Sequence, residues 1–405
     1  MKKLALVCFG VFVGSQVCLA QDITRESLAE EGIEFGFGIT NVYQQNLRGG
    51  SSTHRKAGRF SGSYDVEMSL DAEKLFQLEN GIFFLHAEGA WSKSAGIDSP
   101  SVGSIFGVNG DAAGRRVLDL TEFWYEQPVF GDNLFLRLGK MDITGGFECH
   151  GCPVSFDGSL FANDEATQFL NGALVNNSSI PFPDYGLGAI LHYESDSIWY
   201  VSAGAIDAQA DARETGFNTA FGDEDYFFYI LEAGITPELD SANGPLQGAY
   251  RIGVWNDPQP KANSDNDALG KHYRDDTGFY LSCDQVLSRE NCQDDQGLGA
   301  FFRYGYAPSK SNDITQFVSF GFQYTGLFEG RDEDVIGLGF AHGTLSDTAN
   351  MTYTDDFESV SELYYNIFVN EMLSISPSIQ YVANPGGNQA VSDAVILGVR
   401  AQISF

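Results

Sequence analysis

The feature that most constrains this chain is an alternation of large apolar residues with small or polar ones, repeated through most of its length. In residues 60–70, Phe, Tyr, Val, Met and Leu alternate with Ser, Asp and Glu, and residues 395–405 continue the same pattern with other residues. A period of two places successive side chains on opposite faces of a β-strand. The sequence therefore predicts an all-β fold whose strands each have one apolar face and one hydrated face.

The number of alternating stretches indicates which all-β fold this is. We count them at 35–39, 60–70, 134–138, 187–194, 198–206, 225–235, 250–254, 300–306, 318–324, 336–340, 363–369, 373–381 and 395–405, with two more at 82–91 and 118–126. About 16 strands of this kind are typical of a transmembrane antiparallel β-barrel. A soluble β-sandwich, β-helix or propeller with such small, hydrated inner faces would have a half-empty core. We therefore predict an outer-membrane barrel over residues 35–405.

The connections between these stretches differ in length. Short turns, such as 79–81 and 131–133, alternate with long pieces rich in Gly, Asn, Asp and Ser around 92–116, 145–185, 207–224 and 255–297. Bacterial outer-membrane barrels have short periplasmic turns and long outer loops. We therefore expect these four pieces to be outer loops.

The N-terminal residues have the pattern of an export signal. Lys2 and Lys3 precede an apolar run, and small residues lead to a cleavage position after Ala20. We expect residues 1–20 to be removed and residues 21–34 to contain a short helix that Thr24 can cap. After Ala20 no apolar run approaches the roughly 20 residues of a membrane helix.

The charge balance limits the classes of partner. Asp and Glu number 55 against 23 Lys and Arg, which gives a formal net charge of −32. Such a surface repels phosphate backbones, so we expect no nucleic-acid partner. Aromatic residues make up 13% of the chain, which does not fit an acidic disordered protein.

Four cysteines remain after the leader, and export to an oxidising compartment favours pairing them. We predict two local disulfides, Cys149–Cys152 and Cys283–Cys292, the second clamping a polar loop at its base. The first pair could instead form a redox or metal site, but no second CxxC completes a zinc set. We expect no cofactor and no metal, although Ca²⁺ could bind acids of the outer loops such as Asp284, Asp294, Asp295 and 331–334.

Several ordered segments resemble one family. DAEKL at 71–75, EFWYEQ at 122–127, LGKMD at 138–142, TQFLNGAL at 167–174, GLGAFFRYG at 297–305 and SPSIQYVANPGG at 376–387 resemble the carbohydrate-selective outer-membrane porins of OprB type. The resemblance spans most of the mature chain. It implies a 16-stranded barrel in the outer membrane of a Gram-negative type of cell, through which mono- or oligosaccharides diffuse.

If the apolar parity faces lipid, the opposite parity is the pore wall. The predicted lining is Arg137, Arg251, Arg303, Arg400, Asp65, Glu67, Glu88 and Glu362, with His86, Tyr364, Asn366 and Gln402 on the same parity and Trp124 and Trp255 as candidate stacking rings. Carboxylates accept from sugar hydroxyls, Arg donates to them, and aromatic rings cover the apolar CH face. The same charged residues could simply be hydrated or paired, and both tryptophans could belong to an interface belt. Glu122 and Glu126 share parity with the apolar Leu118 and Leu120, so a bulge or a strand end is needed there.

Other functions remain open. A porin that favours cations or conducts without sugar selectivity fits the negative charge, and the long loops could be adhesive or structural. An enzyme is disfavoured because the chain has no GxSxG or HExxH motif and only 6 His. We expect carbohydrate solutes and outer-membrane lipid as partners, and either a homotrimer or a monomer.

Overall fold

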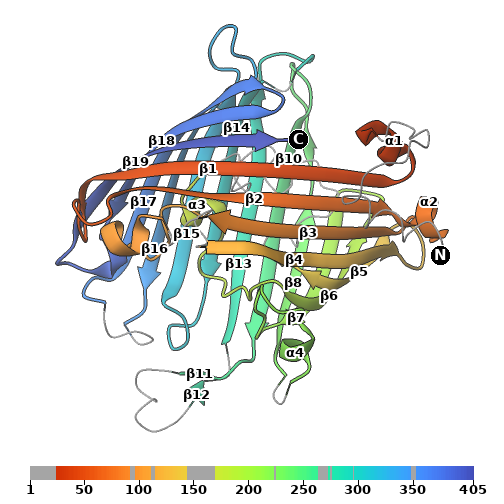
Figure 1. Ribbon diagram of the computed structural model, residues 1–405, viewed down its shortest axis with the longest axis horizontal. Coiled ribbons are helices and arrows are strands. Elements are labelled where there is room, and N and C mark those ends of the chain that lie inside the picture. Colours follow the sequence, from red (N-terminus) through yellow and green to blue (C-terminus); the bar gives the residue numbers. More distant parts are fainter. Residues whose placement is uncertain are drawn as a thin grey trace, which may run out of the picture.

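The chain forms a closed antiparallel β-barrel (Figure 1). The computed structural model describes residues 24–91, 96–110, 115–143, 169–222, 225–262, 272–273, 276–294, 296–347 and 353–405. The main sheet has 17 strands, and without the two-residue β9 (Glu238–Leu239) sixteen long strands remain. β1 (Ile33–Gly50) pairs with both β2 (Gly58–Asp71) and β19 (Ser392–Ser404), which closes the barrel. The predicted fold class is confirmed.

The other long strands follow one another around the barrel. They are β3 (Ile82–Trp91), β4 (Arg115–Pro128), β5 (Leu134–Met141), β6 (Gly186–Glu194), β7 (Trp199–Asp207), β8 (Phe227–Ile235), β10 (Leu246–Asp257), β13 (Asp276–Arg289), β14 (Gly297–Tyr306), β15 (Ile314–Thr325), β16 (Val335–Leu345), β17 (Phe357–Asn370) and β18 (Leu373–Ala383). The short elements are α1 (Arg25–Glu30), α2 (Ala72–Phe76), η2 (Asp98–Val102), α3 (Gly172–Val175), α4 (Phe217–Ala220), η3 (Pro385–Gly387) and the strand pair β11 (Lys261–Ala262) and β12 (His272–Tyr273). Within the described residues, no helix has the length and apolar character needed to cross a membrane.

The barrel has two unlike ends. At one end, where β1 begins and β19 ends, the connections include the short turns 129–133, 195–198 and 371–372. At the other end, β5 joins β6 and β10 joins β13 through much longer connections. We call these the turn end and the loop end. In an outer-membrane barrel the short turns lie on the periplasmic side, so the loop end faces outward.

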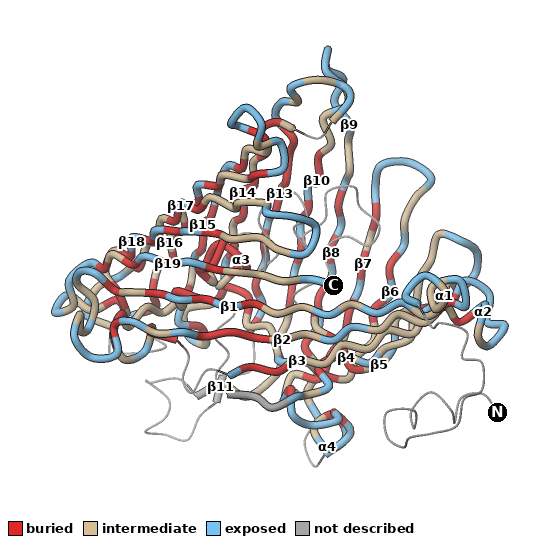
Figure 2. The backbone as a smooth tube through the Cα atoms, turned by 45° about the horizontal axis from the view of Figure 1, so that its top comes forward, coloured by how far each residue is buried: buried red, intermediate tan, exposed pale blue. Residues whose placement is uncertain are grey.

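The predicted alternation is confirmed along the strands. In β10, Ile252 and Val254 are 55% and 46% exposed, whereas Arg251 on the opposite face is 4% exposed. Figure 2 shows the same alternation of buried and exposed residues along neighbouring strands. The exposed apolar parity forms the outer surface of the barrel.

The predicted N-terminal helix is confirmed as α1. Thr24 caps it, because its hydroxyl accepts from the Ser27 backbone N–H at 3.2 Å while the Ser27 hydroxyl accepts from the Thr24 backbone N–H. The helix is only six residues long, and β1 begins at Ile33. The predicted leader, residues 1–20, lies outside the described residues and stays a prediction.

The prediction that residues 255–297 form an outer loop is partly wrong. Residues 276–289 form β13, which lies within the piece 255–297 that we expected to be an outer loop. Cys283 pairs in register with the outward Tyr250, so it is part of the wall and does not close a loop. Cys283 and Cys292 are free thiols, and the predicted disulfide between them is therefore wrong. Cys149 and Cys152 lie outside the described residues.

A bulge in β4 resolves the parity conflict at Glu122. The register against β3 shifts between the pairs His86–Glu122 and Ala87–Leu120, so Thr121 is the extra residue. Leu118 and Leu120 stay on the outer surface, while residues from Glu122 onward change parity. Of the two explanations that the sequence allowed, the bulge is confirmed.

Candidate functional site

Two segments fold back from the loop end into the barrel. Residues 96–110 belong to the β3–β4 connection and residues 169–182 to the β5–β6 connection, and we call them the covering segments. Inward side chains of the wall hold the first one, since Gln44 and Gln380 both donate to the Val108 carbonyl, at 2.7 and 2.9 Å. Figure 1 shows α3, which is part of the second segment, within the outline of the barrel.

A carboxylate at the start of β17 anchors the first covering segment. Glu358 is fully buried and accepts from the Ser104 hydroxyl at 2.5 Å and the Ile105 N–H at 3.0 Å. It also accepts from the Gly386 N–H at 2.6 Å, in the β18–β19 connection. One side chain thus joins three parts of the chain that are far apart in sequence.

A second carboxylate and an arginine anchor the other covering segment. Glu362 accepts from the backbone N–H groups of Leu170 and Asn171, at 3.0 and 2.9 Å. Arg303 donates to the Leu174 carbonyl near the end of α3, at 2.9 Å. Two donors just before this short helix and one carbonyl near its end are therefore bound by charged side chains of the wall, which fixes its position.

Apolar contacts complete this packing. The Phe169 ring lies edge-on to Tyr364, with 4.9 Å between centroids, and 6.0 Å from Phe301. Leu174 and Phe317 belong to the same buried cluster. The inner face of β14–β17 is therefore a dry interface with the covering segments, so its residues do not face the lumen water.

The inner face near β1–β3 is different, because it borders a cavity of about 400 Å³. The side chains around this cavity include three carboxylates and several neutral polar groups. Its lining comprises Asp65, Glu67, Glu88, His86, Thr40, Ser63, Gln402, Ser404 and Tyr185, together with Gly36, Phe37, Gly38 and Phe405. We call this face the open wall.

His86 organises the centre of the open wall. One ring nitrogen lies 3.2 Å from the Asp65 carboxylate and the other 3.0 Å from the Thr121 hydroxyl. The Glu122 carboxylate lies 3.8 Å from the same ring. The His86 ring is therefore held between acidic and hydroxyl groups.

Next to it, on β4 and β5, an aromatic ring is held between charged groups. The Arg137 guanidinium lies 4.0 Å from the centre of the Trp124 ring and donates to Glu126 at 2.9 Å. The Trp124 indole N–H donates to Glu122 at 3.1 Å. Trp124 pairs in register with the inward Phe84 and Gly139, so it is not part of an outer interface belt.

The predicted lining residues thus divide into two groups. Asp65, Glu67 and Glu88 line the cavity, with Trp124 and Arg137 on the adjoining strands. Five others are inward but buried: Arg251, Trp255, Arg303, Glu362 and Arg400. Arg251 forms an ion pair with Asp284 at 2.9 Å, and Trp255 stacks with Phe228 at 6.1 Å.

Sequence reasoning missed Tyr185, which lies just before β6 and lines the cavity. No sequence pattern marked it, because it stands at the end of a long irregular piece.

The acidic residues that could bind Ca²⁺ do not all lie in outer loops, although the sequence suggested that they do. Asp284 is inward in β13, and residues 331–334 connect β15 and β16 at the turn end. Among the described residues, no three His, Cys, Asp or Glu side chains converge on a metal site.

A closed sixteen-stranded barrel with a polar, partly filled lumen defines a porin. The family of carbohydrate-selective porins, OprB family, matches residues 55–405, and the chain belongs to this family. It is therefore a channel of the outer membrane that lets carbohydrates pass.

Two relatives and one solved structure agree with this assignment. Porin B of Pseudomonas aeruginosa is 24% identical over 94% of this chain and 89% of its own length. A putative porin, QuiX, of Acinetobacter baylyi is 22% identical over 100% and 99% of the two chains. The high-pH structure of Pseudomonas putida OprB superposes with a TM-score of 0.79 at 20% identity and covers 94% of this chain and 96% of that one, which shows the fold alone.

Proposed function

We propose that sugars cross the barrel along the open wall and are recognised there by Asp65, Glu67 and Glu88. The observation that supports this proposal is the cavity of about 400 Å³ lined by these carboxylates, by small hydroxyl groups and by Tyr185. Its volume lies within the roughly 300–1,000 Å³ of small-molecule sites. Glu362, Arg303 and Arg400 are buried, so they do not offer the same access.

The chemistry of this wall suits a sugar. Carboxylates accept hydrogen bonds from the ordered hydroxyls, and the amide of Gln402 can both donate and accept. The ring of Tyr185 can cover an apolar CH face of a pyranose. Several weak contacts of this kind orient a solute without trapping it, as flux through a channel requires.

The buried arginines and acids have a different role in this proposal. Glu358, Glu362 and Arg303 hold the covering segments, and these segments leave room in the lumen beside the open wall. They are therefore positioning residues that set the width of the passage. Replacing Arg303 is expected to change the conductance by loosening α3, whereas a loss of direct sugar contacts would change only the sugar block.

A second candidate function follows from the acidity of the open wall. Three carboxylates and one histidine face the cavity, so the field there attracts cations. A porin that favours cations without selecting sugars would share this wall. The two functions differ in whether sugars reduce the ion current.

The test is single-channel recording of the refolded protein in a planar bilayer, with glucose and maltose titrated against the current. For D65N/E67Q we expect sugar block to weaken about fivefold, the effect of losing about 1 kcal/mol of hydrogen bonding. E329Q, in the β15–β16 turn, removes one exposed charge far from the cavity and serves as the control. Block that is equal in all three proteins would contradict sugar recognition at this wall. A lower cation preference in D65N/E67Q, with sugar block unchanged, would favour the second function.

Further expectations on activity, cofactors, partners and oligomeric state complete the proposal. The chain acts as a channel and not as an enzyme, and it needs no cofactor or metal, not even Ca²⁺ at its acidic turns. Its outward apolar faces contact outer-membrane lipid, and it binds no nucleic acid. It works either as a homotrimer or as a monomer, which mass measurement in detergent distinguishes.

A further inference from the structure

A second polar cavity lies at the loop end, between the covering segments and the connections of the wall strands. It has a volume of about 410 Å³. One side comes from Lys261 and the β14–β15 connection, and the other from Ser178, Ser179 and Pro181 of a covering segment. The cavity thus forms where the wall and a covering segment meet at the outer mouth.

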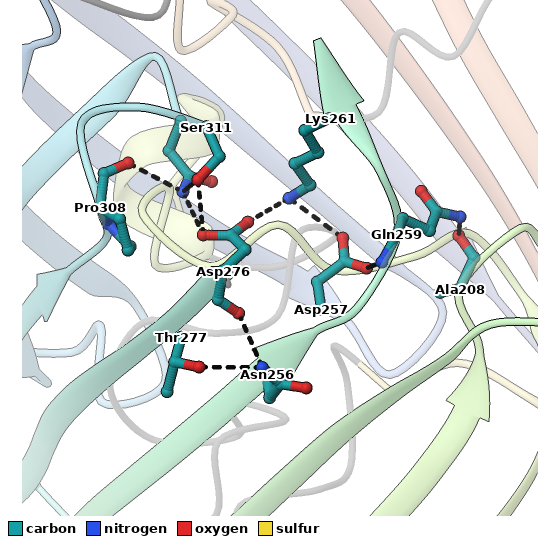
Figure 3. Close-up of polar contacts among 10 residues, drawn as sticks. Ala208, Asn256, Asp257, Gln259, Lys261, Asp276, Thr277, Pro308 and Ser311 are labelled. Carbon is teal, nitrogen blue, oxygen red and sulfur yellow. Dashed lines mark hydrogen bonds and ion pairs between the residues drawn. The ribbon is translucent and has the colours of Figure 1, made fainter. Parts of the chain in front are cut away.

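A buried network fixes the groups on the wall side (Figure 3). The Asp276 carboxylate, at the start of β13, is fully buried and accepts from Asn312 Nδ2 at 2.7 Å and the Ser311 hydroxyl at 3.0 Å. Lys261 forms ion pairs with both Asp276 and Asp257, the second at 3.0 Å. Because each of these groups is already paired within the network, the donors and acceptors keep their positions without a ligand.

The covering segment is equally well fixed on its side. The Ser179 hydroxyl donates to Asn177 Oδ1 at 2.8 Å, and Asn177 Nδ2 donates to the Tyr304 carbonyl of β14 at 3.2 Å. Ser178, beside it, is only partly buried and lines the cavity. The exposed Asp313 lines the cavity from the facing connection, so hydroxyl, amide, ammonium and carboxylate groups surround one small space.

This combination selects a class of ligand. Among the described residues that line the cavity, Lys261 is the one cation, and it is already paired with two carboxylates, which disfavours a phosphate or another anion. Ile105, Ile314 and Pro181 supply apolar contact beside the polar groups. A ligand with many neutral hydroxyls and an apolar face fits, and a pyranose has both.

We infer that this cavity is an outer carbohydrate subsite, which captures a mono- or disaccharide before it reaches the open wall. The inference rests on the proposed function and extends it, because it places two weak sites in series along the passage. Weak sites in series let a solute enter readily and still leave. The subsite raises the rate at which sugars enter from the outer side.

The experiment measures the on-rate of maltose and glucose block from current fluctuations, with sugar added to one side of the bilayer at a time. The variant S178A/D313A removes two lining groups and leaves the Asp276 network intact. We expect its on-rate for sugar added at the loop end to fall at least threefold, with the turn-end on-rate and the ion conductance unchanged. S309A/D356A makes the same chemical changes at the same end, outside the residues that line the cavity, and should behave as the unmodified protein.

Two results would overturn the inference while leaving the proposed function in place. One is an unchanged loop-end on-rate in S178A/D313A, and the other is an equal fall from both ends, which would place the effect in the lumen. If the unmodified protein shows no sugar block from either side, the proposed function and the outer subsite fail together. A turn-end on-rate that falls in D65N/E67Q while its loop-end on-rate stays unchanged would support two separate sites.

Discussion

The two inner surfaces of this barrel are built from the same alternating pattern but have opposite surroundings. On β14–β17, inward residues such as Arg303 and Glu362 are 1% exposed and bind the backbone of the covering segments. On β2 and β3, inward residues such as Asp65 and Glu88 line a cavity. An inward charged residue can therefore have one of two functions in this porin. It can fix the covering segments inside the lumen, or it can contact the solute that passes through.

The largest expected effect comes from removing an anchor on the dry side. Glu362→Ala leaves the N–H groups of Leu170 and Asn171 without their acceptor and removes a negative charge beside the buried Arg400. We expect a loss of about 3 kcal/mol in the free energy that holds the covering segment, and a larger single-channel conductance.

The matched change on the open wall is Glu88→Ala, for which we expect a change in stability within about 0.5 kcal/mol. Thermal unfolding followed by circular dichroism, together with conductance, compares the two variants. Equal effects on both quantities would mean that the division into a dry and an open wall is wrong.

A smaller effect concerns the pH dependence of the first covering segment. Burial, reinforced by the nearby charge of Glu358 and opposed by the Ser104 N–H, raises the pKa of Asp98 from 3.8 to about 7. Because the folded pKa lies above the unfolded one, the stabilisation is complete below about pH 3.8 and is lost as the pH rises through about 7. Residues 96–110 should therefore be held less firmly at pH 8 than at pH 5.

Hydrogen exchange at the Ile105 and Phe106 amides measures this change across pH 5 to 8, after correction for the intrinsic pH dependence of exchange. Asp98→Asn keeps a neutral side chain of the same size that can still accept from Ser104, so its exchange should respond less to pH in this window than that of the unmodified protein. A pH response of the same size in Asp98→Asn would assign the effect to another group.

The smallest expected effect is the change in stability when Cys283 on the barrel wall or Cys292 at the turn end is replaced. Cys283 and Cys292 are free thiols, so replacing either by Ser should change the stability by less than about 0.5 kcal/mol. Peptide mapping after maleimide treatment of the native protein should find Cys292 labelled, because it is exposed. Labelling that appears only after reduction would restore the predicted disulfide.

The barrel itself was predictable because a strand has a fixed period and a lipid-facing side has a narrow choice of residues. Residues 300–306 and 318–324 face as their alternation indicates. The spacing of Cys283 and Cys292 favours a clamped loop where β13 lies, although Phe279 and Leu281 alternate with smaller or more polar neighbours. In this segment the period of two indicates the structure better than the spacing of the cysteines does.

The site was predictable only in part. The alternation correctly predicts that Asp65, Arg303 and Glu362 face inward. It does not predict whether each side chain contacts a covering segment or borders the cavity. The partners of Arg303 and Glu362 come from residues 169–182, more than a hundred positions away, in an irregular segment. Such contacts depend on the closed shape of the barrel, so they could not be derived from the local pattern.

The pairing of β1 with β19 also determines the order in which this protein can be assembled. The Asn41–Ala401 and Gly38–Ser404 register joins the first and last strands of the barrel, so closure has to wait for β19. Until then the sheet has two unpaired edges, which are templates for pairing with other chains. A polypeptide truncated before Ser392 would lack one side of this seam. β19 is therefore required for closure, because only a chain that contains this strand can pair both edges of the sheet.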